Sequence, residues 1–237
     1  MNHTRIGCAG WSIDRESAPR FPAGASHLER YAQVLNAAEI NSSFYRPHQP
    51  QTYERWAASV PADFRFSVKL PRSITHDNRL AGSDELLGRF ADEAGALGDK
   101  LGCVLVQLPP SLALDHRVAD AFFSALAARF GCMIACEARH GGWFGDDATA
   151  LLQAHGVTRV IADPPAREPG PYVPTSGAVY ARLHGSPRMY YSSYDDAYLD
   201  SVAAYLKDKE AWCIFDNTAS GAALPNALSL LQKQQAA

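Results

Sequence analysis

The stretch Met133-Ile-Ala-Cys-Glu-Ala-Arg139 decides the fold. Its first four residues are apolar, and two charged residues, Glu137 and Arg139, follow at alternate positions. Successive side chains of a β-strand point to opposite faces, so Ile134 and Cys136 share one face while Glu137 and Arg139 end the other. An apolar strand with ionisable groups at its carboxyl end is typical of parallel sheets that carry an active site.

Seven further segments follow the same pattern, and nearly all of them end in a polar or charged residue. They are Arg5–Trp11, Glu39–Tyr45, Arg65–Leu70, Leu101–Leu108, Arg159–Asp163, Ala178–Gly185 and Ala211–Asn217. Amphipathic helical patterns fill most of the gaps, and alternation of strands with helices is typical of a parallel α/β sheet. We therefore predict a single α/β domain over residues 1–237, an eight-stranded parallel barrel of the TIM type.

An open, doubly wound sheet is the competing architecture. Such a sheet gives no reason for all eight strands to end in polar groups. The first segment also lacks a GxGxxG fingerprint, because Gly7-Cys-Ala-Gly-Trp11 is only a stretch of mostly small residues. Small residues suit the crowded interior of a barrel, so the sequence favours the closed architecture.

The crossover between the sixth and seventh segments differs from the others. Residues 164–177 contain five prolines in fourteen residues, which excludes a regular helix. The stretch is still long enough to connect two parallel strands. We therefore predict an irregular, proline-rich sixth crossover within one domain.

Length, charge and cysteine content narrow the function classes. The chain has 237 residues and a net charge of −3, so it presents no overall field that attracts nucleic acid or an anionic membrane. It has no run of about 18 apolar residues and begins with a strand, so we expect neither a membrane span nor a signal peptide. The five cysteines show no CxxC spacing, which indicates reduced thiols in a cytoplasmic protein.

Ordered motifs over the whole length carry a family resemblance. They are Gly10–Trp11, Glu39–Tyr45, Lys69–His76, Leu97–Gly102, Gln107–Pro110, Glu137–His140, Trp143–Phe144, Asp163, Arg182–Gly185, Phe215–Thr218, Gly221 and Asn226–Ala227. With these motifs the chain resembles the YecE-like family (domain of unknown function 72). The resemblance implies a TIM-type barrel and does not imply a reaction. The compact first loop and the proline-rich crossover depart from the family pattern.

Positively charged residues gather at the strand ends or just after them. They are Lys69, His76, Arg139, His140, Arg182, His184 and Arg188. Several cations around one pocket suit a phosphate or carboxylate ligand. In a second interpretation Arg65, Arg139 and Arg182 neutralise Glu39, Glu137 and Asp163 inside the barrel. Both roles can coexist, because a guanidinium has five donors.

The loops after the last two segments suggest where a phosphate would bind. Asn217 to Gly221 precede the last helix, and Gly185 follows the seventh segment. In many barrels these two loops bind phosphate through backbone N–H groups and a helix N-terminus. We therefore expect a phosphate near Gly185, Gly221 and Arg182, although both glycines also fit simple turns.

The leading functional hypothesis is a cytoplasmic enzyme that acts on a small anionic, phosphorylated or sugar-like molecule by acid–base chemistry. The candidates for proton transfer are Lys69, Glu137, Asp163 and His184, and Lys69 is also a conceivable Schiff-base residue. The candidate substrate-binding residues are Asn41, Tyr45, His76, Gln107, Arg139, Arg182, Gly185, Tyr191, Asp216, Asn217 and Gly221. Tyr190, Tyr191 and Tyr194 fit either stacking on a sugar or base or packing on the barrel rim.

Two alternatives remain open at this point. A metal-dependent phosphodiesterase or isomerase would use Glu39, Glu137, Asp163, His184 and Asp216 as ligands for a divalent metal, although no HxH or HExxH spacing supports such a site. We therefore expect no cofactor. A non-catalytic anion or nucleic-acid binding module is the other alternative, which the near-neutral charge disfavours. No feature of the sequence indicates an oligomeric state.

Overall fold

The chain folds into a nearly closed barrel of eight parallel strands, as predicted. The structure is a computed structural model that describes residues 4–165 and 170–236. The strands lie in the order β1-β8-β7-β6-β5-β4-β3-β2. Their bounds are β1 Thr4–Cys8, β2 Ala37–Ile40, β3 Arg65–Lys69, β4 Leu101–Gln107, β5 Met133–Glu137, β6 Thr158–Asp163, β7 Val179–Leu183 and β8 Ala211–Phe215.

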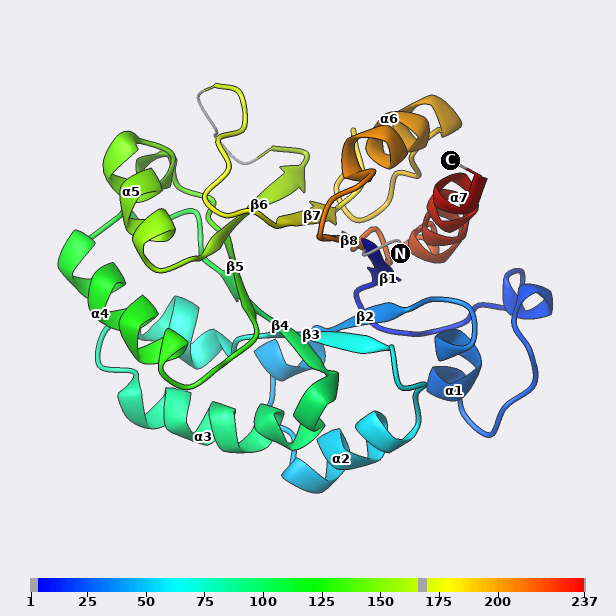
Figure 1. Ribbon diagram of the computed structural model, residues 1–237, viewed down its shortest axis with the longest axis horizontal. Helices are drawn as coiled ribbons and strands as arrows, with labels where there is room; N and C mark the ends of the chain where they lie inside the picture. The colour runs from blue at the N-terminus through cyan, green and yellow to red at the C-terminus, as the bar shows by residue number, and fades with distance from the viewer. Residues whose placement is uncertain (1–3, 166–169, 237) are drawn as a thin grey trace.

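Helices surround the strands on the outside (Figure 1). They are α1 His27–Ala32, α2 Pro50–Ala58, α3 Asp84–Ala94, α4 His116–Ala127, α5 Asp146–Ala154, α6 Asp196–Leu206 and α7 Ala223–Ala236. Asp115 caps α4 by accepting hydrogen bonds from the N–H groups of Arg117 and Val118, as its position before the apolar stripe predicts. No helix in the described ranges has the length and apolar character needed to cross a membrane.

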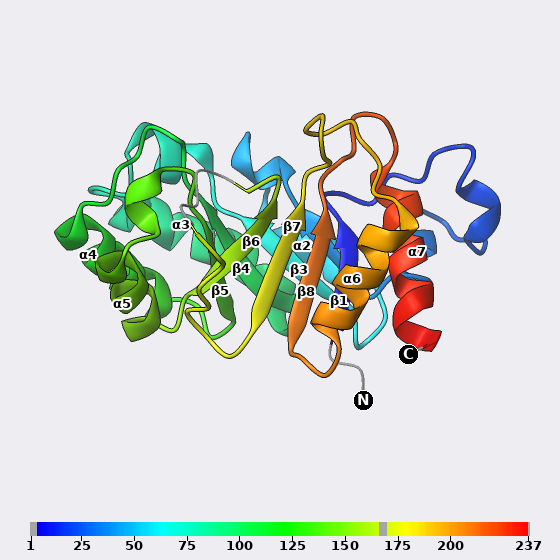
Figure 2. The ribbon, with the colours of Figure 1, turned by 90° about the horizontal axis from the view of Figure 1, so that it is seen from above.

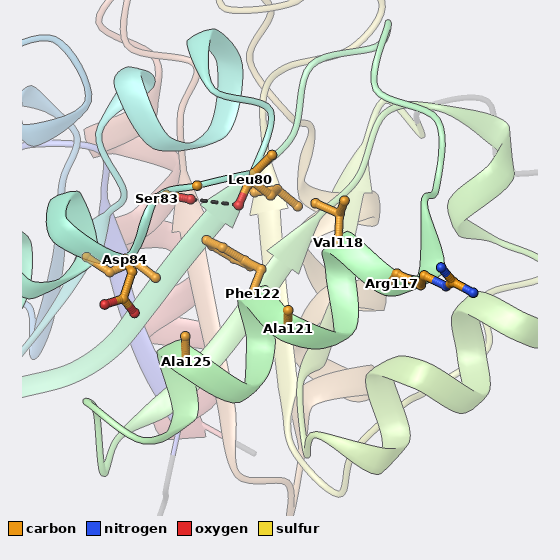
Figure 3. Close-up of a pocket in the computed structure, with 11 residues that line it drawn as sticks. Leu80, Ser83, Asp84, Arg117, Val118, Ala121, Phe122 and Ala125 are labelled. Carbon is orange, nitrogen blue, oxygen red and sulfur yellow. Dashed lines mark hydrogen bonds between the residues drawn. The ribbon is translucent and has the colours of Figure 1, made fainter.

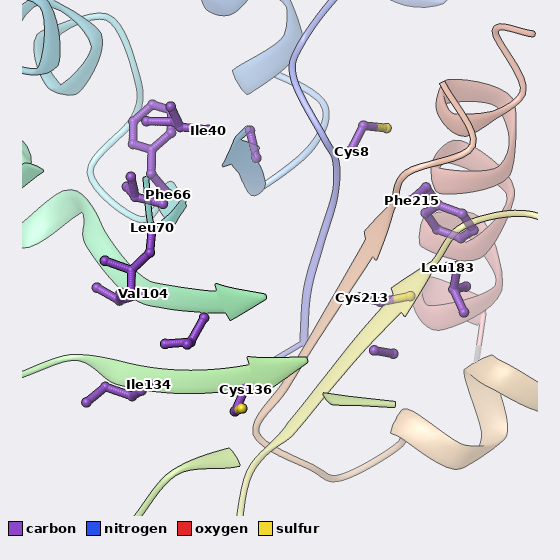
Figure 4. Close-up of a cluster of buried hydrophobic side chains, with 14 of the residues drawn as sticks. Cys8, Ile40, Phe66, Leu70, Val104, Ile134, Cys136, Leu183, Cys213 and Phe215 are labelled. Atoms are coloured by element: carbon purple, nitrogen blue, oxygen red, sulfur yellow. The ribbon is translucent and has the colours of Figure 1, made fainter. Parts of the chain in front are cut away.

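The two faces of the strands have different roles. Apolar side chains on the outer face pack under the helices and form the main core, of which Figure 4 shows Ile40, Phe66, Val104 and Phe215. A smaller apolar cluster fills the barrel interior: Ala37, Cys103, Leu105, Ala135, Val160, Tyr180, Trp212 and Ile214. Above this plug, towards the carboxyl ends of the strands, the interior becomes polar. Figure 2 shows the loops after β7 and β8 gathered at that end.

The barrel closes between β1 and β2 mainly through a side chain. The two strands share one isolated bridge, between Ala9 and Glu39. Further down, the Tyr31 hydroxyl donates to the Ala37 carbonyl at 3.0 Å and accepts from the Cys8 N–H at 2.8 Å. The hydroxyl thus replaces a missing backbone hydrogen bond and satisfies two buried polar groups.

The Asn36 amide extends this seam towards the bottom of the barrel. Its oxygen accepts from the Ile6 N–H at 2.8 Å, and its nitrogen donates to the Thr4 carbonyl at 3.0 Å. Gly7 lies so close to β2 that a Cβ atom there would fall 2.0 Å from the Ala37 oxygen. Glycine at position 7 is therefore required by the close approach of the two backbones.

The second predicted segment differs in detail from the structure, and the sixth crossover agrees with its prediction. The second strand ends at Ile40, because Asn41 has helical φ and ψ and a 3-10 turn (Ser42–Phe44) follows. The crossover from β6 to β7 has no helix among its described residues, as the prolines predict, while its residues 166–169 lie outside the described ranges. Within it, the Tyr172 hydroxyl donates to the Arg159 carbonyl at 2.8 Å, which ties the crossover to β6.

Candidate active site

Arg182 occupies the centre of the polar end of the barrel. It lies on β7 and is 0% exposed. Its guanidinium binds both oxygens of Glu39, at 3.0 and 2.7 Å, and also contacts Glu137 and Asp216, each at 3.0 Å. Strands or strand ends from four parts of the sequence thus meet at one side chain. Burial lowers the pKa of Arg182, but the three carboxylates outweigh burial and hold it well above its usual value.

His184 follows β7 and lies between two carboxylates. Its Nδ1 is 3.0 Å from Asp216 Oδ2, and its Nε2 is 3.0 Å from Glu137 Oε1. Ionised carboxylates only accept hydrogen bonds, so these two contacts fit an imidazolium that donates from both nitrogens, while the donor Arg139 Nη2 also lies 3.1 Å from Nε2. Burial lowers the pKa of His184, but the charge of Glu137 and the hydrogen bond to Asp216 raise it above its ordinary value.

Glu137 is the most heavily shared carboxylate of the site. Its Oε1 atom accepts from Gln107 at 3.2 Å and from Arg139 Nε at 3.0 Å, in addition to His184. Burial raises the pKa of Glu137, but the charges of Arg182 and His184 hold it well below its usual value. We call Glu39, Glu137, Arg139, Arg182, His184 and Asp216 the charge network.

Lys69 is the charged residue of the mouth that the network leaves out. It ends β3 and is 5% exposed, yet no carboxylate among the described residues lies within ion-pair distance of its ammonium group. Its Nζ lies 4.1 Å above the centre of the Phe44 ring instead. Burial, followed by the charge of Arg182, lowers the pKa of Lys69 to about 8, against the opposing effect of Glu39, Glu137 and Asp216.

Asn41 and His76 lie beside Lys69. Ile40 on β2 pairs with Val68 on β3. Asn41 and Lys69 are the next residues on the two chains, so their backbones are neighbours. The Asn41 side-chain oxygen is buried and has no hydrogen-bond partner in the described part of the chain. His76 packs its ring on Phe44 at 4.9 Å, and its pKa is lowered by burial and then by the charge of Lys69.

A family model described as "Protein of unknown function DUF72" matches residues 5–237. The chain belongs to the DUF72 family. This match confirms the resemblance drawn from the sequence motifs. The UPF0759 protein YecE of Escherichia coli (strain K12) is 32% identical over 151 residues, which are 59% of this chain and 53% of that protein. The chain therefore spans about half the length of this relative.

Two further DUF72 relatives extend over the full length. The UPF0759 protein YunF of Bacillus subtilis (strain 168) is 22% identical, over 96% of this chain and 93% of its own. The crystal structure of a DUF72 family protein from Thermotoga maritima superposes with a TM-score of 0.81 at 23% identity, over 98% of this chain and 99% of its own. The structural likeness confirms the barrel.

One predicted catalytic residue of this DUF72 chain is not brought to the mouth. Asp163 accepts a hydrogen bond from the Tyr194 hydroxyl at 2.9 Å on the outer side of β6. Val160 belongs to the cluster inside the barrel, so Asp163, an odd number of positions further along, points outward. The expectation that Asp163 joins the other carboxylates was therefore wrong.

The two loops predicted to bind phosphate are occupied by contacts with each other. The Gly185 N–H donates to the Tyr194 hydroxyl at 2.8 Å, so it is not free for a ligand. The Asn217 amide nitrogen donates to Ser192 O and to Asn226 Oδ1, each at 2.9 Å. Gly221 has a φ of +79° and forms a turn with Thr218. These residues hold the loops in place, and no contact links them to Arg182.

Tyr45 and Tyr191 lie on the rim. Tyr45 is 75% exposed and lines a separate cavity of about 270 Å³ with Arg72 and Arg89. Tyr191 is 46% exposed, and the Arg188 guanidinium lies 4.0 Å above its ring. Neither tyrosine contacts the charge network in the described structure.

Three residues make contacts with the site that only the structure shows. Tyr190 lies 5.8 Å from His184, with their rings perpendicular, and has a φ of +69°, a conformation that non-glycine residues rarely adopt. Phe44 supports Lys69, and the Met189 sulfur lies 3.8 Å from Arg139 Nη1. All three stand outside the strands and α-helices, where neither the period of two residues nor the period of 3.6 residues predicts the direction of a side chain.

The predicted metal ligands do not assemble into a site. No group of three or more His, Cys, Asp or Glu side chains in the described ranges has an arrangement that could hold a metal ion. Asp163 lies on the outer face, and Arg182 occupies both oxygens of Glu39. The residues present therefore do not fit the metal-dependent alternative.

Another cavity lies in the outer layer. Figure 3 shows this cavity, of about 380 Å³, between α3 and α4, lined by Leu80, Val118 and Phe122. Its lining is mainly apolar, and Asp84 and Arg117 lie at its edges. No member of the charge network lines it, so it is not the candidate site.

Proposed function

We propose that the barrel mouth binds a small organic anion, phosphorylated or sugar-like, and catalyses proton transfer on it. The observation that carries this proposal is a buried positive charge without an ion-pair partner. Lys69 is 5% exposed and has no carboxylate within ion-pair distance among the described residues, whereas Arg139, Arg182 and His184 contact Glu39, Glu137 and Asp216. An unbalanced charge in a region of low dielectric is unfavourable, and a bound anion would neutralise it.

Lys69 and Arg139 are the groups that this anion would contact. Arg182 and His184, the other two cations of the charge network, already contact two or more carboxylates each. Arg139 is the more open of the two arginines, with 17% of its side chain exposed against 1% for Arg182. In the described part of the chain its Nη1 atom meets the sulfur of Met189 alone, which is a weak acceptor, so this donor remains available for a carboxylate or phosphate oxygen.

Lys69 supplies the base of the proposed proton transfer, whereas His184 is a fixed part of the charge network, because both of its nitrogens already face carboxylates. Efficient acid–base catalysis needs groups with pKa values near the working pH. The raised pKa of His184 keeps a proton on the imidazole, and the pKa of about 8 for Lys69 makes the neutral amine accessible. Glu137 and Asp216 fix the imidazole through both ring nitrogens.

The anion site is tested by isothermal titration calorimetry with inorganic phosphate and with lactate at pH 7. We expect Lys69→Met to weaken binding about tenfold or more, because it removes one charge-assisted contact. Lys100→Met is the matched control. It removes a lysine whose pKa is also lowered but which precedes β4, at the opposite end of the barrel. Equal affinities of the wild type and Lys69→Met, or no binding of either anion, would contradict the proposal.

A further inference from the structure

We infer that Lys69 forms an imine with its ligand, so that the substrate class is a small anion that carries an aldehyde or ketone group. This inference rests on the proposed function, because it requires the same anion site. It adds a covalent step and a chemical class to that site. The placement of Lys69 among the lysines of the chain is the starting point.

Lys69 differs from the other lysines in burial and in partners. The chain has five lysines, and the other four (Lys100, Lys207, Lys209, Lys233) are half-buried or exposed. Lys69 is 5% exposed, at the carboxyl end of a barrel strand. Among the described residues nothing accepts a hydrogen bond from its Nζ, and the Phe44 ring supports the side chain from one side. The side chain is thus packed on one side, and no described residue ties up the amine through a hydrogen bond.

The environment also favours the nucleophilic form of this amine. Only a neutral amine attacks a carbonyl carbon. With a pKa of about 8, roughly one tenth of the Lys69 side chains are neutral at pH 7, on the order of 100-fold more than for an ordinary lysine. Burial and Arg182 favour the neutral form, while Glu39, Glu137 and Asp216 oppose it. His76, whose own pKa is lowered by burial and by Lys69, faces the same amine.

The atoms of the step balance with the groups present. The neutral amine adds to the carbonyl carbon and gives a carbinolamine, after one proton moves from nitrogen to oxygen. Loss of the hydroxyl group as water takes up one proton from the solvent and leaves a protonated imine. Amine, carbonyl and one proton therefore give imine cation and water, with no oxidant or reductant.

Two groups of the barrel mouth suit such an adduct. Arg139 Nη1, which among the described residues meets the Met189 sulfur alone, would hold the carboxylate or phosphate of the ligand. Asn41 follows the strand that pairs with the strand of Lys69, and its Oδ1, buried without a partner in the described ranges, would accept the N–H of the carbinolamine or of the imine cation. A buried acceptor without a donor is unfavourable, so the adduct would satisfy it.

The test is reductive trapping on the wild-type protein. Pyruvate and glyceraldehyde 3-phosphate serve as anionic carbonyl probes, each with sodium cyanoborohydride at pH 7, followed by peptide mapping by mass spectrometry. We expect the reduced adduct on Lys69 to exceed that on each of the other four lysines by about tenfold or more. Lactate with the reductant is the control without a carbonyl, and acetone is the control without a charge. Mapping in the wild type needs no variant to fold.

Lactate binding by the wild type separates this inference from the proposed function, because lactate has no carbonyl group that could form an imine with Lys69. Lys69→Arg, whose guanidinium forms no imine under these conditions, should give no specific adduct. Lys100→Met should be trapped like the wild type. Adducts spread evenly over the five lysines, or no adduct while lactate still binds, would overturn the imine and leave the anion site standing. If the wild type does not bind lactate, both the imine and the anion site are overturned.

Discussion

Lys69 illustrates how a candidate functional residue lowers stability. Its folded-state pKa of about 8 lies below its ordinary value, so below pH 8 the native state carries a charge that its surroundings disfavour. Between pH 8 and about 10.4 the native state releases this proton first, and the penalty disappears as the pH rises. A shift of this size corresponds to about 3 kcal/mol as an upper bound.

We therefore expect Lys69→Met to raise the free energy of unfolding by about 1–3 kcal/mol at pH 7, and by much less at pH 10. Urea unfolding at the two pH values measures both numbers. Lys207→Met, an exposed position, should change stability by no more than about 0.5 kcal/mol at either pH. If Lys69→Met is destabilised at pH 7, the charge of Lys69 is better compensated than we infer.

Arg182 stabilises the folded protein, in contrast to Lys69, because its positive charge neutralises three buried carboxylates. We expect Arg182→Met to lower the free energy of unfolding by about 3–5 kcal/mol at pH 7, because Glu39 and Glu137 are left buried without a partner. Arg129→Met, which removes an ion pair with the exposed Asp84, should cost about 1 kcal/mol at most.

The pH dependence of this loss gives a second measurement. In the wild type the pKa of Glu137 is lowered, so its stabilisation is complete above its ordinary pKa and is lost as the pH falls through the folded-state value. In Arg182→Met the carboxylates gain stability by protonation instead. The difference between the two proteins, measured by denaturant unfolding, should therefore shrink from pH 7 to pH 4. A constant difference would show that Arg182 acts through packing and not through charge.

The period-two pattern identified most of the mouth from sequence, because most strands keep apolar residues outside and end in a polar residue on the inner face. It correctly brought Lys69, Glu137 and Arg182 together. It failed at β6, where Val160 faces inward and Arg159 and Asp163 face outward. The outer side of β6 meets polar groups such as the Tyr194 hydroxyl and the hydroxyl of Thr149 on α5, so polar residues are satisfied there. The sequence of β6 alone does not show which groups pack on its outer side.

At the scale of elements, strand ends were less predictable than strands. The segment that begins at Glu39 reads as one strand to Tyr45, yet the chain turns after Ile40. Ser43 explains the turn, because its hydroxyl contacts the carbonyls of Ile40 and Lys69 at 2.9 and 2.6 Å. Such a side-chain contact with the end of a neighbouring strand is a tertiary effect that propensity does not contain.

At Cys8 and Ala37 the seam between β1 and β2 is held by the Tyr31 hydroxyl. We expect Tyr31→Phe to lower the free energy of unfolding by about 1–3 kcal/mol, because it leaves the Cys8 N–H and the Ala37 carbonyl buried without partners. Tyr53→Phe is the matched control, since the Tyr53 hydroxyl is buried and makes no hydrogen bond in the described structure. It should be neutral or slightly stabilising. Urea unfolding compares the two, and equal effects would show that the Tyr31 hydroxyl does not close the barrel.

At the scale of the whole molecule, closure determines what the sequence can and cannot reveal. Eight similar segments predict eight strands, and parallel order predicts that their carboxyl ends meet, so the fold and the position of the site follow from pattern alone. Which charges pair is set by distances across the barrel interior. The bond between Arg182 and Glu39 joins positions 143 residues apart, and no local pattern contains it. Lys69 is left over only as a result of that pairing.

Closure also predicts that the chain unfolds as one unit. Each strand has a neighbour on both sides, since β8 pairs with β1 and β1 meets β2 at the Tyr31 seam. Opening the seam exposes both halves at once, so neither half has a core that survives alone. We expect tryptophan fluorescence, which reports Trp56 on α2 and Trp212 on β8, to follow the same urea transition as far-ultraviolet circular dichroism. Tyr31→Phe should move both curves by the same amount to lower urea and keep them superimposed, whereas Tyr53→Phe should leave them in place. Separation of the two curves in Tyr31→Phe would mean that the halves of the barrel fold independently and that the seam only docks them.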